Sequence, residues 1–389
     1  MKILYNLSYP GDRLDVQRAG HIVRANAILN GLEALGHTVI RIEAAEDKEA
    51  RLAVSTYQNL IKNRLPSSIA LKLRDVGRVV QSRRYAHRLI EAIEHHRPDC
   101  ILETHVPFNL AGKLASDKTG TPLIIDDVAP VWEEEQQYGV GFKSLAQKTY
   151  QQVANRANLL IAVNKTLKKY LLEQGLPEKK ILVVENGIDG LLFNPLVDGR
   201  KYRAQYGFRE DEVILVFVGS FQPYHRVDFL LNAFANIVTK QPARLLFVGD
   251  GNHRPEAEVL AKRLGLADKT VFTGRIPYDE VSAYAAAGDI AIMPATNEYG
   301  NPMKVYEYMA LGKAVIAPNQ DTITEIAKHN QNAYLFEPEN VHSLGLAIQM
   351  LIDDANLRRI LSENAGKLAS SFTWQTRAKV LEQAILKII

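Results

Sequence analysis

Residues 216–231 read VFVGSFQPYHRVDFLL and contain the unit from which the fold is built. Three apolar residues end at Gly219 and Ser220, and an apolar periodic segment resumes at Val227. A strand, a glycine turn and a helix in this order are typical of the βα unit of a parallel sheet. This stretch therefore predicts an α/β fold.

Short apolar segments alternate with helical patterns on both sides of this unit. In the first half of the chain they are 2–6, 39–42, 100–103, 123–126, 159–163 and 181–184; in the second half they are 213–218, 244–248, 270–273, 290–293, 314–317 and 334–336. Strands that are mostly apolar are expected where helices cover both faces of a sheet. We therefore predict two doubly wound, Rossmann-like sheets, followed by helices from 340 to 389.

A cluster of turn-forming residues separates the two series. Residues 186–190, NGIDG, and Asn194-Pro195 interrupt the pattern as an interdomain linker would. We place one domain at 1–190 and the second at 191–372, with a final helix at 373–389 that Thr373 caps. Because ligands bind beyond the carboxyl ends of parallel strands, we expect functional side chains in the loops that follow strands, in a cleft between the two domains.

The composition excludes several classes of protein. The 389 residues carry a formal net charge of +3, and the single cysteine, Cys100, excludes an intrachain disulfide or a multi-cysteine metal cluster. No apolar stretch approaches the ~18 residues of a membrane span. The segment 1–6 lacks the apolar core of a secretory signal, so we expect a cytoplasmic protein.

Positive charge is concentrated between residues 61 and 90. Eight lysines and arginines stand against one acid there, Asp75, and apolar residues are interleaved with them. This pattern is typical of a basic amphipathic element that lies on anionic lipid at a membrane surface. It also fits a solvated basic face on helices whose apolar stripe packs in the core, so both interpretations stay open.

The strongest functional pattern follows the apolar segment 290–293. Residues 297–313, NEYGNPMKVYEYMALGK, predict a loop at Gly300, Asn301 and Pro302 and then a helix with Lys304 in its first turn. Lysine opposes the helix dipole at that position, and an anion such as a diphosphate would remove the conflict. Glu307 lies on the same helical face and is suited to accept hydrogen bonds from the vicinal hydroxyls of a ribose.

Two further glycine turns are candidate phosphate sites. Gly20 would stand at a helix N-terminus after the first strand, and Gly219 with Ser220 precedes the pair His225-Arg226. The alternatives are that Gly20 only permits a tight turn and that Arg226 is a surface cation. No G-x-G-x-x-G follows the first strand and no P-loop occurs, which disfavours a dinucleotide dehydrogenase and excludes a P-loop nucleotide site.

Polar residues also end two strands of the first half. His105 follows one strand, and Asp126 and Asp127 end the next. Adjacent carboxylates fit a raised pKa and a role in proton handling, but also a polar strand end. His105 fits a substrate contact or a hydrogen-bonding loop residue.

Taken together, these segments resemble glycosyltransferase family 4, the nucleotide-sugar enzymes of the GT-B fold. The matching motifs are 301–304 (NPMK), 307–310 (EYMA), 218–221 (VGSF), 225–228 (HRVD), 186–189 (NGID) and 36–39 (GHTV). The resemblance implies two Rossmann-like domains that face each other across a cleft. The segment around Trp374 is similar to the family's last helix, which crosses back onto the first domain.

The resemblance also implies roles for residues of this chain. The backbone of Gly20, with Lys304 and a base from the His225-Arg226 pair, would hold the donor diphosphate, Glu307 the ribose, and Ile276 the base, most commonly uracil. The implied donor-binding set is Gly20, Gly219, Ser220, His225, Arg275, Ile276, Tyr299, Gly300, Asn301, Pro302, Met303, Val305 and Glu307. The implied catalytic set is Lys304, Arg226, Asp127, Asp126 and His105.

Four positions depart from the family pattern. Ser220 and His225 stand where an arginine and a lysine are common, which shifts charge compensation toward Arg226 or Lys304. Tyr299 stands eight residues before Glu307, where a carboxylate usually fixes a hydroxyl of the donor sugar. One of Asp126 and Asp127 falls in the region where family members often place a histidine.

The expected activity is retaining transfer of a hexose from a nucleotide sugar, with UDP-glucose as the donor, in polysaccharide or glycoconjugate biosynthesis. The acceptor would be a saccharide or a lipid-linked saccharide, reached by peripheral contact of 61–90 with the inner face of the membrane. No Asp-x-Asp occurs, so we expect neither a metal ion nor another cofactor, and no nucleic-acid partner. The alternatives are a catalytically silent nucleotide-binding member of the family and a nucleotide-sugar epimerase or hydrolase.

Overall fold

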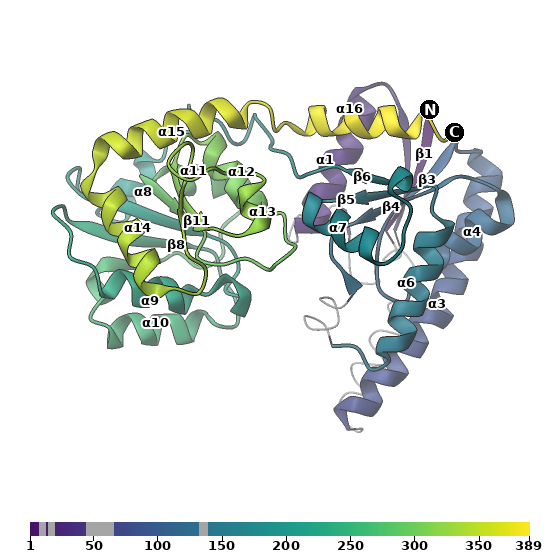
Figure 1. Ribbon diagram of the computed structural model, residues 1–389, viewed down its shortest axis with the longest axis horizontal. Coiled ribbons are helices and arrows are strands. Elements are labelled where there is room, and N and C mark those ends of the chain that lie inside the picture. Colours follow the sequence, from purple (N-terminus) through teal and green to yellow (C-terminus); the bar gives the residue numbers. More distant parts are fainter. Residues whose placement is uncertain (8–12, 15–19, 44–65, 132–138) are drawn as a thin grey trace. The chain divides into compact units, whose positions relative to one another are not determined.

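The computed structural model describes the chain except for residues 8–12, 15–19, 44–65 and 132–138 (Figure 1). The described residues form two compact units, one made of Met1–Glu185 with Trp374–Ile389 and the other of Asn186–Thr373. The first unit thus ends at Glu185, directly before the NGIDG cluster, whereas the sequence placed the boundary at 190.

The first unit contains a parallel sheet of six strands in the order β2-β1-β3-β4-β5-β6. The strands are β1 (Lys2–Leu7), β2 (Thr38–Glu43), β3 (Cys100–Thr104), β4 (Leu123–Asp127), β5 (Leu159–Ala162) and β6 (Ile181–Val183). Its helices are α1 (Gly20–Ala34), α3 (Ser67–His96), α4 (Ala111–Thr119), α6 (Lys143–Arg156), α7 (Lys165–Glu173) and α16 (Trp374–Ile385), with a short 3-10 turn at Glu178–Lys180.

The second unit repeats this plan with the order β12-β11-β10-β7-β8-β9. The strands are β7 (Val213–Val218), β8 (Ala243–Val248), β9 (Thr270–Phe272), β10 (Ile290–Ile292), β11 (Ala314–Pro318) and β12 (Tyr334–Phe336). The helices are α8 (Arg200–Gln205), α9 (Val227–Ala235), α10 (Arg254–Arg263), α11 (Val281–Ala286), α12 (Met303–Ala310), α13 (Asp321–Thr324), α14 (Val341–Asp353) and α15 (Ala355–Ala369), with 3-10 turns at Pro223–His225, Ala267–Lys269 and Tyr278–Glu280. Two doubly wound sheets are therefore confirmed.

Burial on both faces explains why the strands are apolar throughout. Along β7, Val213, Leu215 and Phe217 pack in one apolar cluster of the second unit. Ile214 and Val216 point the other way and pack in a second cluster. Helices on each side of the sheet supply the rest of both clusters, so an alternating polar pattern has no place in this strand.

The last helix packs against the first unit. A Cβ atom on Gly31 of α1 would lie only 2.7 Å from the Cβ of Ala378 in α16, so glycine permits this close approach. Nε2 of His37 lies 2.6 Å from Oε1 of Glu382 at the same contact. None of the helices in the described ranges combines the length and the apolar character needed to span a bilayer.

The strand orders single out one position inside each sheet, where the order of the strands reverses. In the second unit the order reverses between β7 and β10, and in the first unit between β1 and β3. Ligands of doubly wound sheets bind at such switch points, outside the carboxyl ends of the strands. The loops after β7 and β10, at 219–226 and 293–302, are therefore where a site of the second unit is expected.

Candidate functional site

The loop after β10 leads into α12, and Lys304 is the second residue of that helix. Pro302 stands immediately before the first helical residue, where a missing N–H breaks no helical hydrogen bond. The Lys304 ammonium points back to the end of β7: it lies 2.9 Å from Nε2 of His225 and 4.9 Å from the centre of the Phe217 ring. The predicted position of Lys304 in the first turn is confirmed.

Lys304 and Glu307 are a partly buried pair of opposite charges without a direct contact. Burial lowers the pKa of Lys304 to about 7, although the negative charge of Glu307 raises it in part. Burial raises the pKa of Glu307 to about 7, against the influence of Lys304. Among the described residues, no carboxylate lies within ion-pair distance of the ammonium. A ligand that brings an anion to Lys304 and hydroxyls to Glu307 would stabilise both charged forms.

His225 fixes the position of Lys304 without neutralising its charge. Nδ1 of His225 lies 2.6 Å from the backbone oxygen of Ser220, so it carries the proton and donates to that carbonyl. Nε2 is then free to accept a hydrogen bond from the Lys304 ammonium. Burial, and next the positive charge of Lys304, lower the pKa of His225 to about 3, so the ring is neutral at pH 7.

Gly219 lies beside Lys304 at the end of β7. We call Lys304, Glu307, His225 and Gly219 the Lys304 cluster. The φ of 157° at Gly219 lies at the edge of the region that favours glycine. A Cβ atom there would lie 2.7 Å from Nζ of Lys304 and 3.2 Å from Cζ of Phe217. The lysine therefore occupies the space that any larger residue at 219 would need.

Gly219→Ala is expected to push the Lys304 ammonium away from its position and to strain the backbone, at a cost of about 1–3 kcal/mol of stability. Thermal unfolding measures the loss of stability, and the same measurement with UDP tests whether the nucleotide binding that the resemblance implies becomes weaker. Gly190→Ala is the matched control, because no atom lies within 4 Å of a Cβ at that position. Equal behaviour of the two variants would contradict the close packing of Gly219 and Lys304.

The loop before α12 is held by its own side chains. Oδ1 of Asn301 accepts the backbone N–H of Asn186 at 3.0 Å, and Nδ2 of Asn301 donates to the Tyr306 hydroxyl at 3.0 Å. The Tyr299 hydroxyl accepts from Nδ2 of Asn297 at 2.9 Å. Asn301 and Tyr299 thus shape the loop with their side chains. Gly300 and Met303 belong to the same segment and are partly exposed.

Val305 does not fit the predicted donor-binding role. Its side chain is fully buried in an apolar cluster of the second unit. Its backbone N–H lies 3.1 Å from the oxygen of Pro302. The residue therefore offers a ligand no free group, because the helical period turns position 305 toward the core.

The loop after β8 lies between the loops after β7 and β9 and contacts both. The N–H of Gly249 donates to the oxygen of Gly274 at 3.2 Å, and a Cβ on Gly249 would lie 2.1 Å from the oxygen of Gly219. Arg275 is exposed and Ile276 is half-buried in the loop after β9. The segment that the sequence assigned to the base is thus tied to the same edge of the sheet as Gly219.

Arg226 is turned away from the Lys304 cluster, contrary to the predicted shared grip on a diphosphate. It takes a left-handed conformation with φ 48°, which sends its side chain to the outer side of α9. There the guanidinium lies 3.3 Å from carboxylate oxygens of both Asp228 and Glu339. Ser220 is exposed, and its backbone oxygen accepts the hydrogen bond from Nδ1 of His225.

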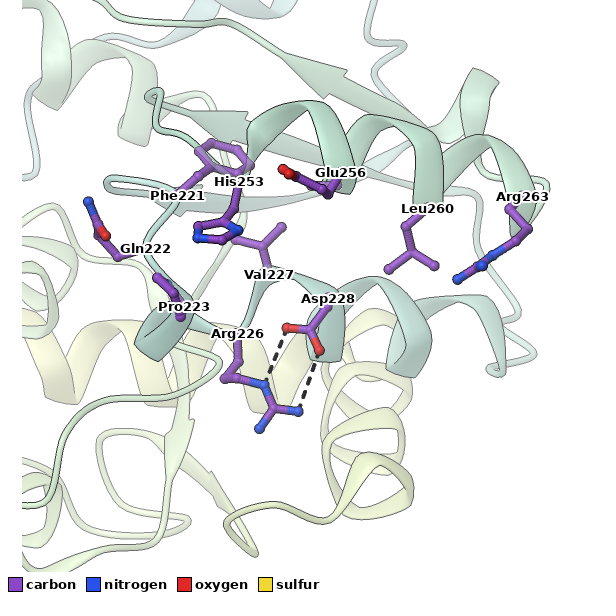
Figure 2. Close-up of a pocket in the computed structure, with 11 residues that line it drawn as sticks. Phe221, Gln222, Pro223, Arg226, Val227, Asp228, His253, Glu256, Leu260 and Arg263 are labelled. Carbon is purple, nitrogen blue, oxygen red and sulfur yellow. Dashed lines mark hydrogen bonds and ion pairs between the residues drawn. The ribbon is translucent and has the colours of Figure 1, made fainter. Parts of the chain in front are cut away.

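A hollow of about 440 Å³ lies between α9 and α10, on the side of the loop that carries Arg226 (Figure 2). Figure 2 shows the contact between Arg226 and Asp228 at the start of α9, with His253, directly before α10, and Glu256 of α10 on the other side. The residues that line it are Phe221, Gln222, Pro223, Arg226, Val227, Asp228, His253, Glu256, Ala257, Leu260 and Arg263. Lys304 and Glu307 are not among them, so this hollow is distinct from the Lys304 cluster.

In the first unit, Gly20 is the first residue of α1, and Arg24 of the same helix is buried. Nη2 of Arg24 lies 2.9 Å from Oδ1 of Asp126, and Nε lies 3.0 Å from Oδ2. The same guanidinium donates to the backbone oxygen of Val184 at 2.8 Å. Asp126 is therefore the buried partner of a bidentate ion pair, which contradicts the expectation that it faces a ligand.

Asp127 and His105 both contact Tyr150, and like Asp126 both are buried. Asp127 accepts the Tyr150 hydroxyl, and burial raises the pKa of its carboxyl to about 7. The His105 ring lies edge-on to Tyr150 with centres 4.9 Å apart, and burial lowers its pKa to about 4. The predicted raised pKa is thus present at Asp127, but both side chains lie inside the unit and not at its surface.

Two family models together match most of the chain. The model of glycosyl transferases group 1 matches residues 198–368, and that of Glycosyltransferase Family 4 matches residues 20–190. The chain belongs to the family 4 type of GT-B glycosyltransferases. The order of the two matches follows the order of the two units along the chain.

Curated relatives of this glycosyltransferase have different substrates in their names. The chain is 30% identical over 211 residues to the N-acetyl-alpha-D-glucosaminyl L-malate synthase of Bacillus anthracis, which is 54% of each protein. It is 26% identical to the D-inositol 3-phosphate glycosyltransferase of Kribbella flavida, over 84% of this chain and 78% of the relative. The matched part spans only 54–60% of the length of the first relatives found.

Solved structures share the fold over the whole chain. HepE from Anabaena, solved in complex with UDP and glucose, is 19% identical with a TM-score of 0.75, and each chain is covered completely. The sucrose-phosphate synthase of Thermosynechococcus elongatus is 18% identical with a TM-score of 0.76, over 99% of this chain and 98% of that one. The GT-B fold is therefore confirmed for this glycosyltransferase.

The structure brings together only part of the predicted site. Lys304, Glu307, His225 and Gly219 form one cluster, whereas Arg226 lies outside it. Sequence reasoning missed Phe217, over which the ammonium lies, and Tyr308, whose hydroxyl accepts the N–H of Val218 at 2.8 Å. Both look like ordinary core aromatics in the sequence, so no pattern distinguishes them.

Proposed function

We propose that the chain transfers a hexose from UDP-glucose to a saccharide or lipid-linked acceptor with retention of anomeric configuration, in polysaccharide or glycoconjugate biosynthesis. The observation that carries the proposal is the Lys304 ammonium, partly buried at the start of α12 with no carboxylate of the described residues within ion-pair distance. An anion completes such a site, and a nucleoside diphosphate also supplies ribose hydroxyls for Glu307. The UDP, UDP-glucose and glucose bound in HepE structures support this choice of donor.

In the proposed reaction, the bond between the sugar C1 and the diphosphate oxygen breaks while the acceptor oxygen bonds to C1 from the same face. Negative charge develops on the departing diphosphate, where Lys304 and the N–H groups of α12 stabilise it. The departing phosphate oxygen takes the acceptor proton, so the step needs no strong protein base. In this proposal the chain's own cation performs the charge compensation, and no divalent metal or cofactor takes part.

The test is UDP release from UDP-glucose over a panel of saccharide and lipid-linked acceptors, with and without EDTA. The configuration of the new glycosidic bond is read from the anomeric proton of the product. Acceptor-dependent release that EDTA leaves unchanged and a retained configuration would support the proposal. An inverted product, or a need for a divalent ion, would contradict the corresponding part of it.

Ser220 and His225 favour one alternative, a catalytically silent member of the family that binds nucleotide. His225 is neutral and Ser220 carries no charge, so Lys304 provides the one cation of this cluster among the described residues. UDP binding without turnover over the whole acceptor panel would establish that alternative. Conversion of the sugar while it stays linked to UDP would instead establish an epimerase.

Binding of UDP at pH 8 is expected to take up about one proton. Burial holds the pKa of Lys304 at about 7, so the free amine is largely neutral at that pH, and a diphosphate would raise the pKa again. Glu307, with a pKa of about 7, is mostly ionised at pH 8 and contributes little. Calorimetry in buffers of different ionisation enthalpy measures this uptake.

Lys304→Met is the control for the proton balance. Proton uptake should disappear in this variant, even if some UDP binding remains. Uptake of a full proton by Lys304→Met would show that another group titrates and that the lysine does not contact the diphosphate.

We further propose a cytoplasmic location with peripheral contact at the inner face of the membrane through 61–90. Residues 61–65 lie outside the described residues, so the support comes from α3. The proposed membrane contact is based on the basic residues concentrated in α3 and on the proposed lipid-linked acceptor.

A further inference from the structure

The outward face of α3 carries a line of exposed apolar side chains. Ile69, Leu73, Val76 and Val80 are 47%, 48%, 46% and 52% exposed. Their spacing of four, three and four residues places them on one side of the helix, over about 16 Å of its length. We call these four residues the α3 stripe.

The opposite face of α3 packs in the first unit, so the stripe is additional to the core face of the helix. Ala70 and Tyr85 are buried on that opposite face, as are Ala86 and Leu89. A helix of a folded unit normally has one apolar face, which points inward. A second apolar line on the solvent side has no role in the core of this unit.

Polar anchors prevent α3 from rotating to bury the stripe. Asp75 is fully buried and accepts the backbone N–H groups of Gly141 and Phe142 at 2.6 and 3.1 Å. Arg74 lies 2.9 Å from the same carboxylate. A Cβ on Gly141 would lie 2.5 Å from the backbone nitrogen of Lys72, so the helix backbone touches this segment directly. These contacts of Asp75 and Lys72 with residues 141 and 142 therefore fix the orientation of the α3 stripe.

The charges around the stripe are positive. Lys72, Arg83 and Arg84 are exposed residues on the same side of α3. The one acid between 67 and 90 is Asp75, which points inward. Apolar side chains flanked by lysine and arginine match the boundary between the acyl chains and the anionic headgroups of a membrane. In a symmetric dimer through this face the basic residues would gather close together, which disfavours a second copy.

We propose that the α3 stripe docks on an anionic phospholipid surface, with its apolar side chains in the headgroup boundary and the neighbouring basic side chains at the lipid phosphates. The inference rests on the proposed function in one respect, namely that docking would bring a lipid-linked acceptor to the enzyme. The binding itself needs neither donor nor acceptor and is measured without them.

The test is cosedimentation of the full chain with phosphatidylcholine vesicles, with and without phosphatidylglycerol. Binding is expected at low salt on the anionic vesicles and is expected to fall in high salt. Leu73→Ser combined with Val80→Ser should lower the partition coefficient at least tenfold, and Arg83→Glu about fivefold or more. Val238→Ser is the matched control, because Val238 is 82% exposed in the second unit and should leave binding unchanged.

A fluorescent label reports the depth of the stripe directly. An environment-sensitive dye on Val76→Cys should shift to the blue on anionic vesicles, whereas the same dye on Val238→Cys should not. UDP binding and turnover of a water-soluble acceptor should be the same in the stripe variants and in the unmodified chain. This separates failure of docking from failure of the proposed activity.

Three outcomes would overturn the inference. The first is no binding to anionic vesicles at low salt, and the second is binding that the stripe variants leave intact. The third is a dimer by light scattering that the stripe variants dissociate, which would make a second copy the occupant of this face.

Discussion

Lys304→Ala is expected to lower turnover with UDP-glucose about 100- to 1,000-fold, which corresponds to about 2.7–4 kcal/mol of barrier. The ammonium is the cation nearest the end of β7, where His225 holds it, and the proposed departing diphosphate gains its negative charge there. His225 is neutral and Arg226 is engaged by two carboxylates, so neither replaces the lost charge. Initial rates at saturating donor measure the effect on kcat.

Lys313→Met is the matched control for this prediction. Lys313 is also a partly buried lysine of the second unit, but its ammonium donates to the backbone oxygen of Ala286 at 2.8 Å. Its removal should reduce stability and leave the turnover of the folded protein nearly unchanged. His105→Ala should likewise have a far smaller effect than Lys304→Ala. Equal losses of turnover in Lys304→Ala and His105→Ala would refute the assignment of Lys304.

The strands could be predicted because each is short and buried on both faces. Residues of β7 alternate between two apolar clusters, so the whole segment is apolar and stands out between polar turns. The domain boundary could be located only approximately, because turn-forming residues mark a region. Glu185, the last residue of the first segment of that unit, precedes those turn formers.

The site could be predicted where one helix sets its geometry. Lys304 and Glu307 are three residues apart on α12, so the helical period alone places them on one face. The same period places Val305 in the core, and the resemblance to a family could not reveal that. The partnership of Lys304 with His225 joins positions 79 residues apart and depends on how two strands pair.

The fate of Arg226 could not be predicted from the sequence. Its left-handed backbone and its contact with Glu339, which lies 113 residues farther along the chain, both follow from tertiary structure. The same holds for Asp126, whose partner Arg24 lies 102 residues away. A structural carboxylate at a strand end and a ligand-binding carboxylate look the same in the sequence. They can be told apart only when the residue that pairs with the carboxylate, here Arg24, is known.

Asp126→Ala is expected to destabilise the first unit by about 3–5 kcal/mol. The variant removes the carboxylate that accepts two hydrogen bonds from the buried Arg24 guanidinium, while the Val184 oxygen remains an acceptor. Tryptophan fluorescence during urea unfolding reports on this unit through Trp374, which is buried there; Trp132 lies outside the described residues.

Two further variants separate a structural role of Asp126 from a role in the reaction. Asp117→Ala removes the ion pairs of an exposed carboxylate with Lys113 and Arg156 and should cost about 1 kcal/mol or less. The double variant Arg24→Met with Asp126→Leu removes both charges and should recover most of the stability that Asp126→Ala loses. If Asp126 contacted the transferred sugar instead, Asp126→Ala would stay stable and lose turnover, and the double variant would be as inactive as the single one.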